Sequence, residues 1–240
     1  MVGYMTDSDR FSWTVLLPVK VLARAKSRLA VLAGDRRHEL ALALAADTVS
    51  AVLACPEVAR VIVVTSDPVA GPRLAALGAH IIDEASGNPL ELSGELPPEP
   101  ADGSQRALNA ALLRGASAAA RRWPGTGLAA LTADLPALRP AELAAALRAT
   151  GHGSQRASFV PDAAGVGTTL YAVPPGGEFR PMYGGTSRTR HAAAGAAELT
   201  LGNIAGLRQD VDTPDDLRAA VALGVGPRTA EVAAQLLADA

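Results

Sequence analysis

Short apolar runs alternate along the chain with longer stretches in which apolar residues recur at helical spacing. The runs at 13–19, 60–64 and 128–131 are each followed by such a stretch. An apolar run without strict alternation is typical of a strand that is buried on both faces of a parallel sheet. Strands that alternate with helices in this way predict an α/β fold, in which ligands bind at the carboxyl ends of the strands.

The run at 128–131 ends on Thr132-Ala133-Asp134, and Pro136 prevents its continuation as a central strand. We therefore expect Asp134 at the carboxyl end of a buried strand, facing the ligand crevice. A carboxylate there requires a cationic partner, and a metal ion is one such partner. The alternative is an ordinary turn or capping residue ahead of the helix predicted from Pro140.

A group of cations directly follows the first predicted strand. Its four members fall within nine residues: Lys20, Arg24, Lys26 and Arg28. Such a run is usually the solvated face of a helix, but a lysine just after a strand end also points toward the crevice. We interpret the run as a triphosphate-binding segment. The pattern G-x-G-x-x-G is absent here, which removes the main support for a dinucleotide site.

Helical periodicity also predicts helices over 35–54, 68–77, 104–122, 140–149 and 227–238. Asp35 is the predicted N-cap of the first, whereas Thr65-Ser66-Asp67 either caps the second or reads a base edge. Asn109 either offers a donor and an acceptor to a nucleotide or belongs to an ordinary helix. The Pro-rich and Gly-rich stretch at 83–103 is predicted to be a long loop, either a lid or disordered.

Two glycine-containing segments are candidate anion sites. The loop 163–167 joins strands predicted at 158–162 and 168–173 and places Thr168 beside exposed backbone, although it fits a plain hairpin turn equally well. Gly184 precedes Ser187 and Arg188 at the start of a helix predicted to end near Glu198.

Two aspartates stand close together near the end of the chain, at a predicted strand end that follows Gly206. Asp212 is predicted to cap the helix that Thr213 and Pro214 open. Asp210 has no evident capping role, so it is the second candidate metal ligand. If the strand geometry holds, both side chains lie on one side.

Composition restricts the possible functions. The chain has 240 residues, of which 49% are hydrophobic and 19% charged, which predicts one globular domain over 12–240 after a loose tail at 1–11. The net charge of −2 gives no indication of nucleic-acid binding. The single Cys55, expected to pack at a helix end, excludes an internal disulfide framework. With no apolar stretch long enough to span a membrane, we expect a cytoplasmic protein, either a monomer or a homodimer.

Taken in order, these segments resemble the nucleotidyltransferases of the CofC/FbiD family, a branch of the GlmU/MobA-like fold. The matching stretches are Pro18–Lys20, Lys26–Leu29, Ala133–Pro136, Gly167–Thr169, Gly184 with Ser187-Arg188, and Asp210–Leu217. The resemblance implies a three-layer αβα Rossmann-like nucleotidyltransferase fold, that of nucleotide-diphospho-sugar transferases, with a mostly parallel central sheet. The chain departs from the family at Ala133, where many members have glycine, and in the loop from Ser86 to Gly103, which is longer than expected.

The resemblance implies a guanylyltransferase that joins GMP from GTP to a small phosphorylated carboxylate in the biosynthesis of the deazaflavin coenzyme F-420. Phosphoenolpyruvate is the favoured acceptor, and 2-phospho-L-lactate and 3-phospho-D-glycerate are the alternatives. Another MobA-like nucleotidyltransferase, such as a molybdopterin guanylyltransferase, and a catalytically silent GTP-binding domain are more distant alternatives. A phosphate monoester is largely dianionic at neutral pH and needs no general base, in keeping with the lack of a convincing catalytic histidine.

The resemblance also assigns roles to the candidate residues. Asp134 and Asp210 are expected to hold Mg²⁺ and, with Lys20, to form the catalytic group. The acceptor is expected to contact Thr168, Gly184, Ser187 and Arg188, and the nucleotide Pro18, Lys20, Lys26, Arg28 and Asn109.

Overall fold

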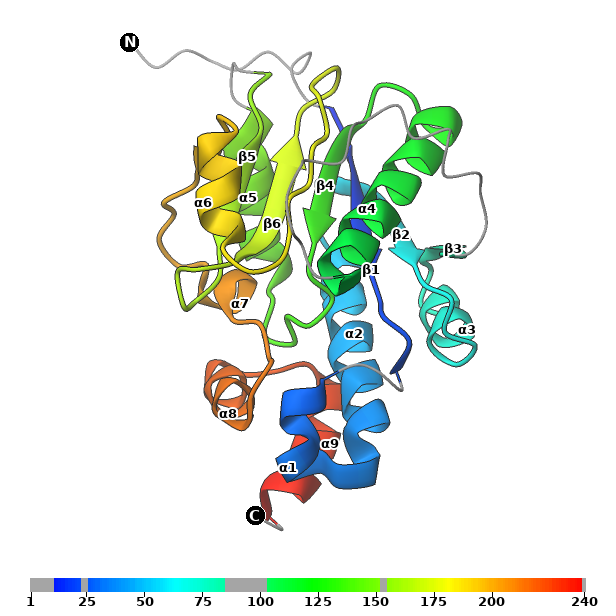
Figure 1. Ribbon diagram of the computed structural model, residues 1–240, viewed down its shortest axis with the longest axis vertical. Coiled ribbons are helices and arrows are strands. Elements are labelled where there is room, and N and C mark those ends of the chain that lie inside the picture. Colours follow the sequence, from blue (N-terminus) through cyan, green and yellow to red (C-terminus); the bar gives the residue numbers. More distant parts are fainter. Residues whose placement is uncertain (1–10, 23–25, 85–102, 152–154, 239–240) are drawn as a thin grey trace.

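The computed structural model describes residues 11–22, 26–84, 103–151 and 155–238 (Figure 1). The predicted tail at 1–11 and the predicted loop at 83–103 therefore lie almost wholly outside the described residues, as does Arg24 of the cation run.

The described strands and helices alternate along most of the chain, as the apolar pattern predicts. The strands are β1 (Trp13–Pro18), β2 (Val58–Val64), β3 (His80–Ile82), β4 (Gly127–Leu131), β5 (Ser158–Pro161), β6 (Thr168–Val173) and β7 (Ala197–Glu198). The α-helices are α1 (Ala30–Ala33), α2 (Arg37–Leu53), α3 (Ala70–Ala75), α4 (Gly103–Arg122), α5 (Pro140–Gly151), α6 (Ser187–Ala193), α7 (Ala205–Arg208), α8 (Pro214–Leu223) and α9 (Pro227–Ala238). Short 3₁₀ helices, η3 (Ser27–Leu29) and η4 (Gly34–Arg36), flank α1.

The strands form one sheet in the order β3-β2-β1-β4-β6-β5-β7. β1 pairs in parallel with both β2 and β4, and β2 pairs in parallel with β3. Only β6 runs against its neighbours β4 and β5. The mostly parallel sheet predicted from the sequence is therefore confirmed, and its parallel strands end together at the lower edge in Figure 1.

Both faces of the sheet are covered, because side chains of each central strand alternate between two cores. Val15 and Leu17 of β1 belong to the core shared with α2 and α5, whereas Leu16 belongs to the core under α4. Each of these three side chains is fully buried. The result is the three-layer αβα arrangement visible in Figure 1.

A third core lies below the sheet, where α1, α8 and α9 pack around the N-terminal half of α2 (Figure 1). Val211 is fully buried in this core, together with Leu217 of α8 and Val232 of α9. Burial of Val211 fixes the segment that carries Asp210 and Asp212. No helix among the described residues combines the length and the apolar character needed to cross a bilayer.

Several local predictions are wrong. Asp35 lies in η4 instead of capping α2, whose N-cap residue is Arg36 and makes no side-chain capping bond. The helix predicted to reach Glu198 ends at Ala193, because Gly195 at φ +89° reverses the chain into β7. The strand predicted after Gly206 is instead the short helix α7. Asp67 accepts the N–H groups of Val69 and Ala70 just ahead of α3, whose N-cap residue is Val69.

Candidate active site

A cavity of about 520 Å³ lies at the carboxyl ends of β1 and β4, where the alternating pattern predicts a ligand site. Leu108 and Leu112 of α4 form part of its wall. Nine of the predicted site residues line it: Pro18, Lys20, Lys26, Arg28, Asp134, Thr168, Gly184, Ser187 and Asp210. Segments far apart in sequence therefore meet at one site.

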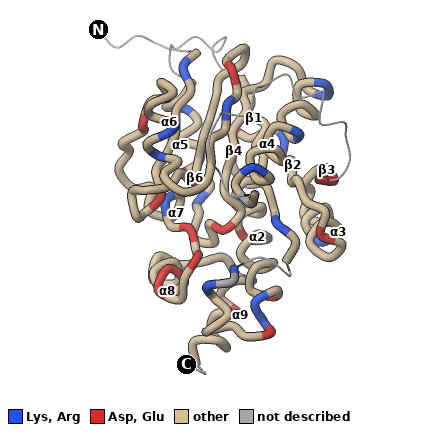
Figure 2. The backbone as a smooth tube through the Cα atoms, in the orientation of Figure 1, with Lys and Arg blue, Asp and Glu red and all other residues tan. Residues whose placement is uncertain are grey.

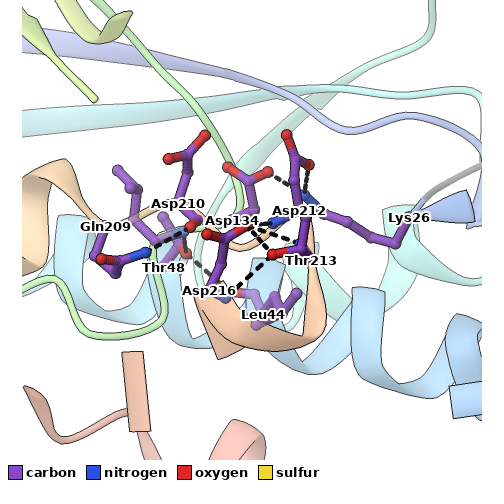
Figure 3. A network of polar contacts seen from close by, with 10 residues as sticks. Lys26, Leu44, Thr48, Asp134, Gln209, Asp210, Asp212, Thr213 and Asp216 are labelled. Atoms are coloured by element: carbon purple, nitrogen blue, oxygen red, sulfur yellow. Dashed lines mark hydrogen bonds and ion pairs between the residues drawn. The ribbon is translucent and has the colours of Figure 1, made fainter. Parts of the chain in front are cut away.

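Three aspartates converge on the cavity, with their carboxyl groups on the same side in Figure 3: Asp134, Asp210 and Asp212. The backbone brings them together, because Val211 N–H donates to the carbonyl oxygen of Asp134 at 3.2 Å. The end of β4 is held in turn by Thr48 of α2, whose hydroxyl accepts the N–H of Leu135 at 2.9 Å. The predicted convergence of Asp134 and Asp210 is thus present in the fold.

Lys26 lies between two of these carboxylates. Its ammonium donates to Asp134 Oδ2 and, at 2.8 Å, to Asp212 Oδ1 (Figure 3). Burial alone would lower the pKa of Lys26, but Asp134 and Asp212 outweigh this effect and hold the pKa above its ordinary value. The backbone of Lys26 has φ +54°, a left-handed conformation that costs free energy in a non-glycine residue. The fold thus places a charged ammonium between two acids in a strained conformation.

The carboxylates remain incompletely satisfied even with Lys26 in place. Asp134 Oδ1 is buried and has no hydrogen-bond partner. Burial, followed by repulsion from Asp134, Asp212 and Asp162, raises the pKa of Asp210 to about 8. An unpaired carboxylate oxygen and an acid that resists ionisation are both stabilised by an added cation.

This donor set fits a magnesium ion that is shared with a substrate. Among the described parts of the chain, no three His, Cys, Asp or Glu side chains are arranged to enclose a metal by themselves. Mg²⁺ typically takes one or two carboxylates and completes its shell with water and substrate phosphates. Asp134 and Asp210 supply carboxylates of this kind.

Cationic residues line the same cavity as these acids. Lys20 and Arg28 both line it and are exposed. Figure 2 shows basic and acidic segments close together beneath the lower edge of the sheet, near α2, α7 and α8. The N–H of Leu22 donates to Asp67 Oδ2 at 2.7 Å, which ties the segment after Lys20 to the start of α3.

Uncharged groups form another part of the cavity. Thr168 and Ser187 line it and are only 4% and 1% exposed, respectively. Gly184 has φ +101°, and a Cβ on it would lie 2.5 Å from the side chain of Gln105. The backbone conformation therefore favours glycine here, and an added Cβ would also displace the Gln105 side chain.

Asn109 and Arg188 do not line the cavity. The Asn109 amide accepts the Tyr183 N–H at 2.9 Å and donates to the Tyr183 carbonyl at 3.1 Å. Arg188 donates to both carboxylate oxygens of Glu198 and to the carbonyl of Gly165, each at 2.9 Å. Both residues therefore support the site from outside the cavity. Asn109 holds the segment that carries Gly184, and Arg188 holds the loop that carries Gly167.

The prediction that Asp212 is an N-cap is wrong. The cap of α8 is Thr213, whose hydroxyl accepts the Asp216 N–H while the Asp216 carboxylate accepts the Thr213 N–H. Asp212 is thereby left to pair with Lys26. The sequence T-x-x-D at 213–216 is a capping-box signal that could have identified Asp212 as a site residue.

Two further cavity residues escaped the sequence analysis. Asp162 accepts the N–H groups of Val166 and Gly167 at 2.8 and 2.7 Å, and so shapes the loop before Thr168. Gln105 reaches the cavity from the first turn of α4. An aspartate before a glycine-containing loop was a usable signal for the first, whereas the second depends on how α4 lies across the sheet.

No family model matches the sequence, but individual proteins do. Phosphoenolpyruvate guanylyltransferase of Thermomonospora curvata is 54% identical over 225 residues, which cover 94% of this chain and 90% of that protein. The protein of the same name from Streptomyces avermitilis is 55% identical over 226 residues, covering 94% and 95%. The chain belongs to the phosphoenolpyruvate guanylyltransferase family. This membership confirms the resemblance seen in the sequence and makes the chain an enzyme of the nucleotidyltransferase class.

This member of the guanylyltransferase family shares its fold with proteins of known structure, although their sequences are only 12% to 14% identical to it. A cytidylyltransferase from Leptospira borgpetersenii is 12% identical, with a TM-score of 0.53 over 95% of both chains. CMP:2-keto-3-deoxy-manno-octonic acid synthetase, solved with CTP, is 14% identical, with a TM-score of 0.50 over 88% of this chain and 98% of that one. The nucleotidyltransferase fold is therefore confirmed.

Proposed function

We propose that the chain joins GMP from GTP to the phosphate group of phosphoenolpyruvate and releases pyrophosphate, as a step in the biosynthesis of the deazaflavin coenzyme F-420. The observation that carries the proposal is the shared description of relatives that match almost the whole chain at 54% and 55% identity. The cavity supports it, because it combines cationic, acidic and uncharged hydrogen-bonding parts. A cytoplasmic location and the oligomeric state stay predictions.

In the proposed reaction, a phosphate oxygen of phosphoenolpyruvate attacks the α-phosphorus of GTP. A new P–O bond forms as the bond between the α-phosphorus and the bridging oxygen breaks, and pyrophosphate carries the electron pair away. With a second pKa of about 6, the attacking phosphate is already largely dianionic at neutral pH. No protein group needs to remove a proton, so catalysis consists of positioning and charge stabilisation.

The main obstacle is repulsion between two polyanions. Like charges ~4 Å apart repel by about 4 kcal/mol at an effective dielectric of 20. Lys20 and Arg28 line the cavity and are suited to neutralise the triphosphate. Lys26 is already charged within the site and lies next to Asp134, so it can contact a phosphate there without a change in its protonation state.

We assign Mg²⁺ binding to Asp134 and Asp210, with Asp212 beside them. The buried Oδ1 of Asp134 without a partner and the raised pKa of Asp210 support this assignment. Bound there, the ion would neutralise phosphate charge. The uncharged part of the cavity is assigned to the acceptor, where Thr168 and Ser187 offer hydroxyl groups and the left-handed Gly184 allows close approach to the backbone.

The test is to incubate the full-length protein and GTP with phosphoenolpyruvate, 2-phospho-L-lactate and 3-phospho-D-glycerate separately. Mass spectrometry identifies the guanylylated product, and a coupled assay measures pyrophosphate. We expect the highest kcat/KM with phosphoenolpyruvate. A higher kcat/KM with either of the other two acids would show that this acid, and not phosphoenolpyruvate, is the acceptor. GTP binding without turnover on any phosphorylated acid would identify a silent GTP-binding domain.

A further inference from the structure

His191 of α6 is fully buried and takes no part in the proposed reaction, yet it touches a residue that does. Its Nδ1 lies 3.0 Å from the hydroxyl oxygen of Thr168. Its Nε2 lies 3.0 Å from the backbone nitrogen of Met182. His191 itself does not line the cavity, whereas Thr168 does.

These two contacts determine the tautomer of the imidazole. A backbone N–H can only donate, so Nε2 of His191 must accept from Met182 and carry no proton. The proton of the neutral ring is then on Nδ1, which donates to the Thr168 oxygen. The hydroxyl of Thr168 receives this bond, and its own hydrogen remains available to donate elsewhere.

The surroundings keep the ring neutral and fixed in orientation. It stacks on Tyr171 with 4.6 Å between ring centroids and meets the edge of Tyr183 at 5.6 Å. Burial, with the nearby charge of Arg190, lowers the pKa of His191 to about 3. The imidazole therefore stays neutral throughout the physiological pH range, and the direction of its hydrogen bond to Thr168 does not change.

Helix α6 carries both His191 and Ser187, a residue of the uncharged part of the cavity. Ser187 and His191 are four residues apart, so they lie on the same face of α6. Ser187 lines the cavity and is 1% exposed, and His191 lies one turn further from it.

We propose that His191 is a positioning residue that fixes the Thr168 hydroxyl as a hydrogen-bond donor toward the anionic group of the phosphorylated acceptor. The proposal rests on the function proposed above and deepens it. A hydroxyl that can rotate serves as donor or acceptor, whereas one that already accepts from His191 presents its hydrogen to the cavity. Such a group favours an anionic oxygen and disfavours a ligand that offers only N–H or O–H donors.

Two matched substitutions separate the contacts of the ring. In His191→Asn, the amide nitrogen takes the position of Nδ1 and keeps a donor near Thr168. In His191→Gln, the longer side chain places its carbonyl oxygen near Met182 N–H and loses the donor to Thr168. Both variants place an amide in the same buried site, so a purely structural role predicts similar effects for both.

The measurement is KM for phosphoenolpyruvate and for GTP, with melting temperature as the control for folding. We expect His191→Gln to raise the acceptor KM by about 5- to 10-fold, in line with one uncharged hydrogen bond, while the KM for GTP stays within about twofold of wild type. His191→Asn is expected to recover most of this loss. In a Thr168→Val background, His191→Gln should add less than about twofold, because the group that it orients is gone.

Equal losses in both variants, an equal rise in both KM values, or additive effects in the Thr168→Val background would overturn the proposal. An independent measurement does not require turnover. In ¹⁵N NMR spectra of the wild-type chain, the proton of His191 should be on Nδ1, and an Nε2–H tautomer would overturn the inference. If the wild type gives no product with GTP and any of the three acids while Nδ1 carries the proton, the proposed function fails and the orientation of Thr168 stands.

Discussion

The two ends of the cavity are organised by opposite principles. At the acidic end, Asp134 has an unpartnered buried oxygen, Asp210 resists ionisation, and Lys26 is held with φ +54°. At the uncharged end, Thr168 and Ser187 are almost completely buried. The first end is electrostatically incomplete, whereas the second is packed and preorganised.

This difference follows from what each end is proposed to bind. The metal ion proposed for the acidic end would bring the positive charge that stabilises Asp134 and Asp210. A small acceptor brings less binding energy and benefits more from groups that are already oriented. Substitutions at the acidic end should therefore change turnover and pH-dependent stability, whereas those at the uncharged end should change acceptor affinity.

The largest expected effect comes from Asp134→Asn. The substitution removes a proposed metal ligand and a partner of Lys26 while leaving the end of β4 in place. We expect kcat/KM for pyrophosphate release to fall by at least about 10³-fold, comparable with the loss of an electrostatic contribution of about 4 kcal/mol. The circular-dichroism spectrum should remain that of the wild type.

Asp215→Asn is the matched control, because the Asp215 side chain is 93% exposed on α8 and pairs only with Arg218 among the ion pairs described. It should retain wild-type turnover. Near-wild-type turnover of Asp134→Asn would show that Asp134 takes no part in the reaction. The proposed difference between the acidic and the uncharged end would then be wrong.

A smaller effect is expected at the uncharged end from Gly184→Ala. The added methyl would meet Gln105 at 2.5 Å in a backbone at φ +101°. A flexible Gln105 can move aside, but the conformational cost of roughly 1–2 kcal/mol remains. We expect the KM for the acceptor to rise about 10-fold with little change in the KM for GTP, measured by steady-state kinetics.

Gly125→Ala provides the control for backbone strain alone. Gly125 has φ +83° and no atom within 4 Å of an added Cβ. It should lose a similar amount of stability without any change in the acceptor KM. If both variants change the kinetics equally, strain and not the shape of the cavity is responsible.

The acidic end should also lower stability as the pH rises. Because the folded pKa of Asp210, about 8, is above its ordinary value of 3.8, the folded state keeps a proton that the unfolded chain has lost. The contribution of Asp210 to stability therefore falls between about pH 4 and pH 8, and Asp210→Asn should be spared this loss. We expect the variant to be more stable by about 1–2 kcal/mol at pH 8.5 without metal, discounted for solvent screening, and by much less at pH 4.

Urea unfolding at the two pH values measures this difference. The same experiment on Asp215→Asn should show none, because that carboxylate is exposed. A variant that is less stable than wild type at pH 8.5 would mean that Asp210 stabilises the fold, contrary to an electrostatically incomplete acidic end.

The sequence predicted the layout of the fold because each central strand is an uninterrupted apolar run. It also indicated Asp134, which directly follows a buried strand, and Asp210, which has no evident capping role; both line the cavity. It did not reveal the partner of Asp134. The pairing with Lys26 spans 108 residues and depends on how η3 follows β1 in space.

Sequence reasoning was weakest where the role of a residue depends on contacts that the local sequence does not show. Asp212 precedes a helix, as an N-cap would, but Thr213 takes that role. His191 lies in an alanine-rich segment with no pattern around it, and its contacts with Thr168 and Met182 arise only when α6 packs against the sheet. A local pattern identifies helix caps and strand ends, whereas a side chain's partner across the fold depends on packing.

Arg188 gives the smallest expected effect and the sharpest test of the boundary of the uncharged end. The sequence suggested that it binds the acceptor, but its guanidinium is occupied by Glu198 and Gly165 and its side chain is 42% exposed. Arg188→Gln should change stability little, because exposed ion pairs contribute little, and should change the acceptor KM by less than about twofold. Ser187→Ala, one residue away and inside the cavity, should raise that KM several-fold. Equal increases in both variants would place a cation at the acceptor, and the division of the cavity into a charged and an uncharged end would no longer hold.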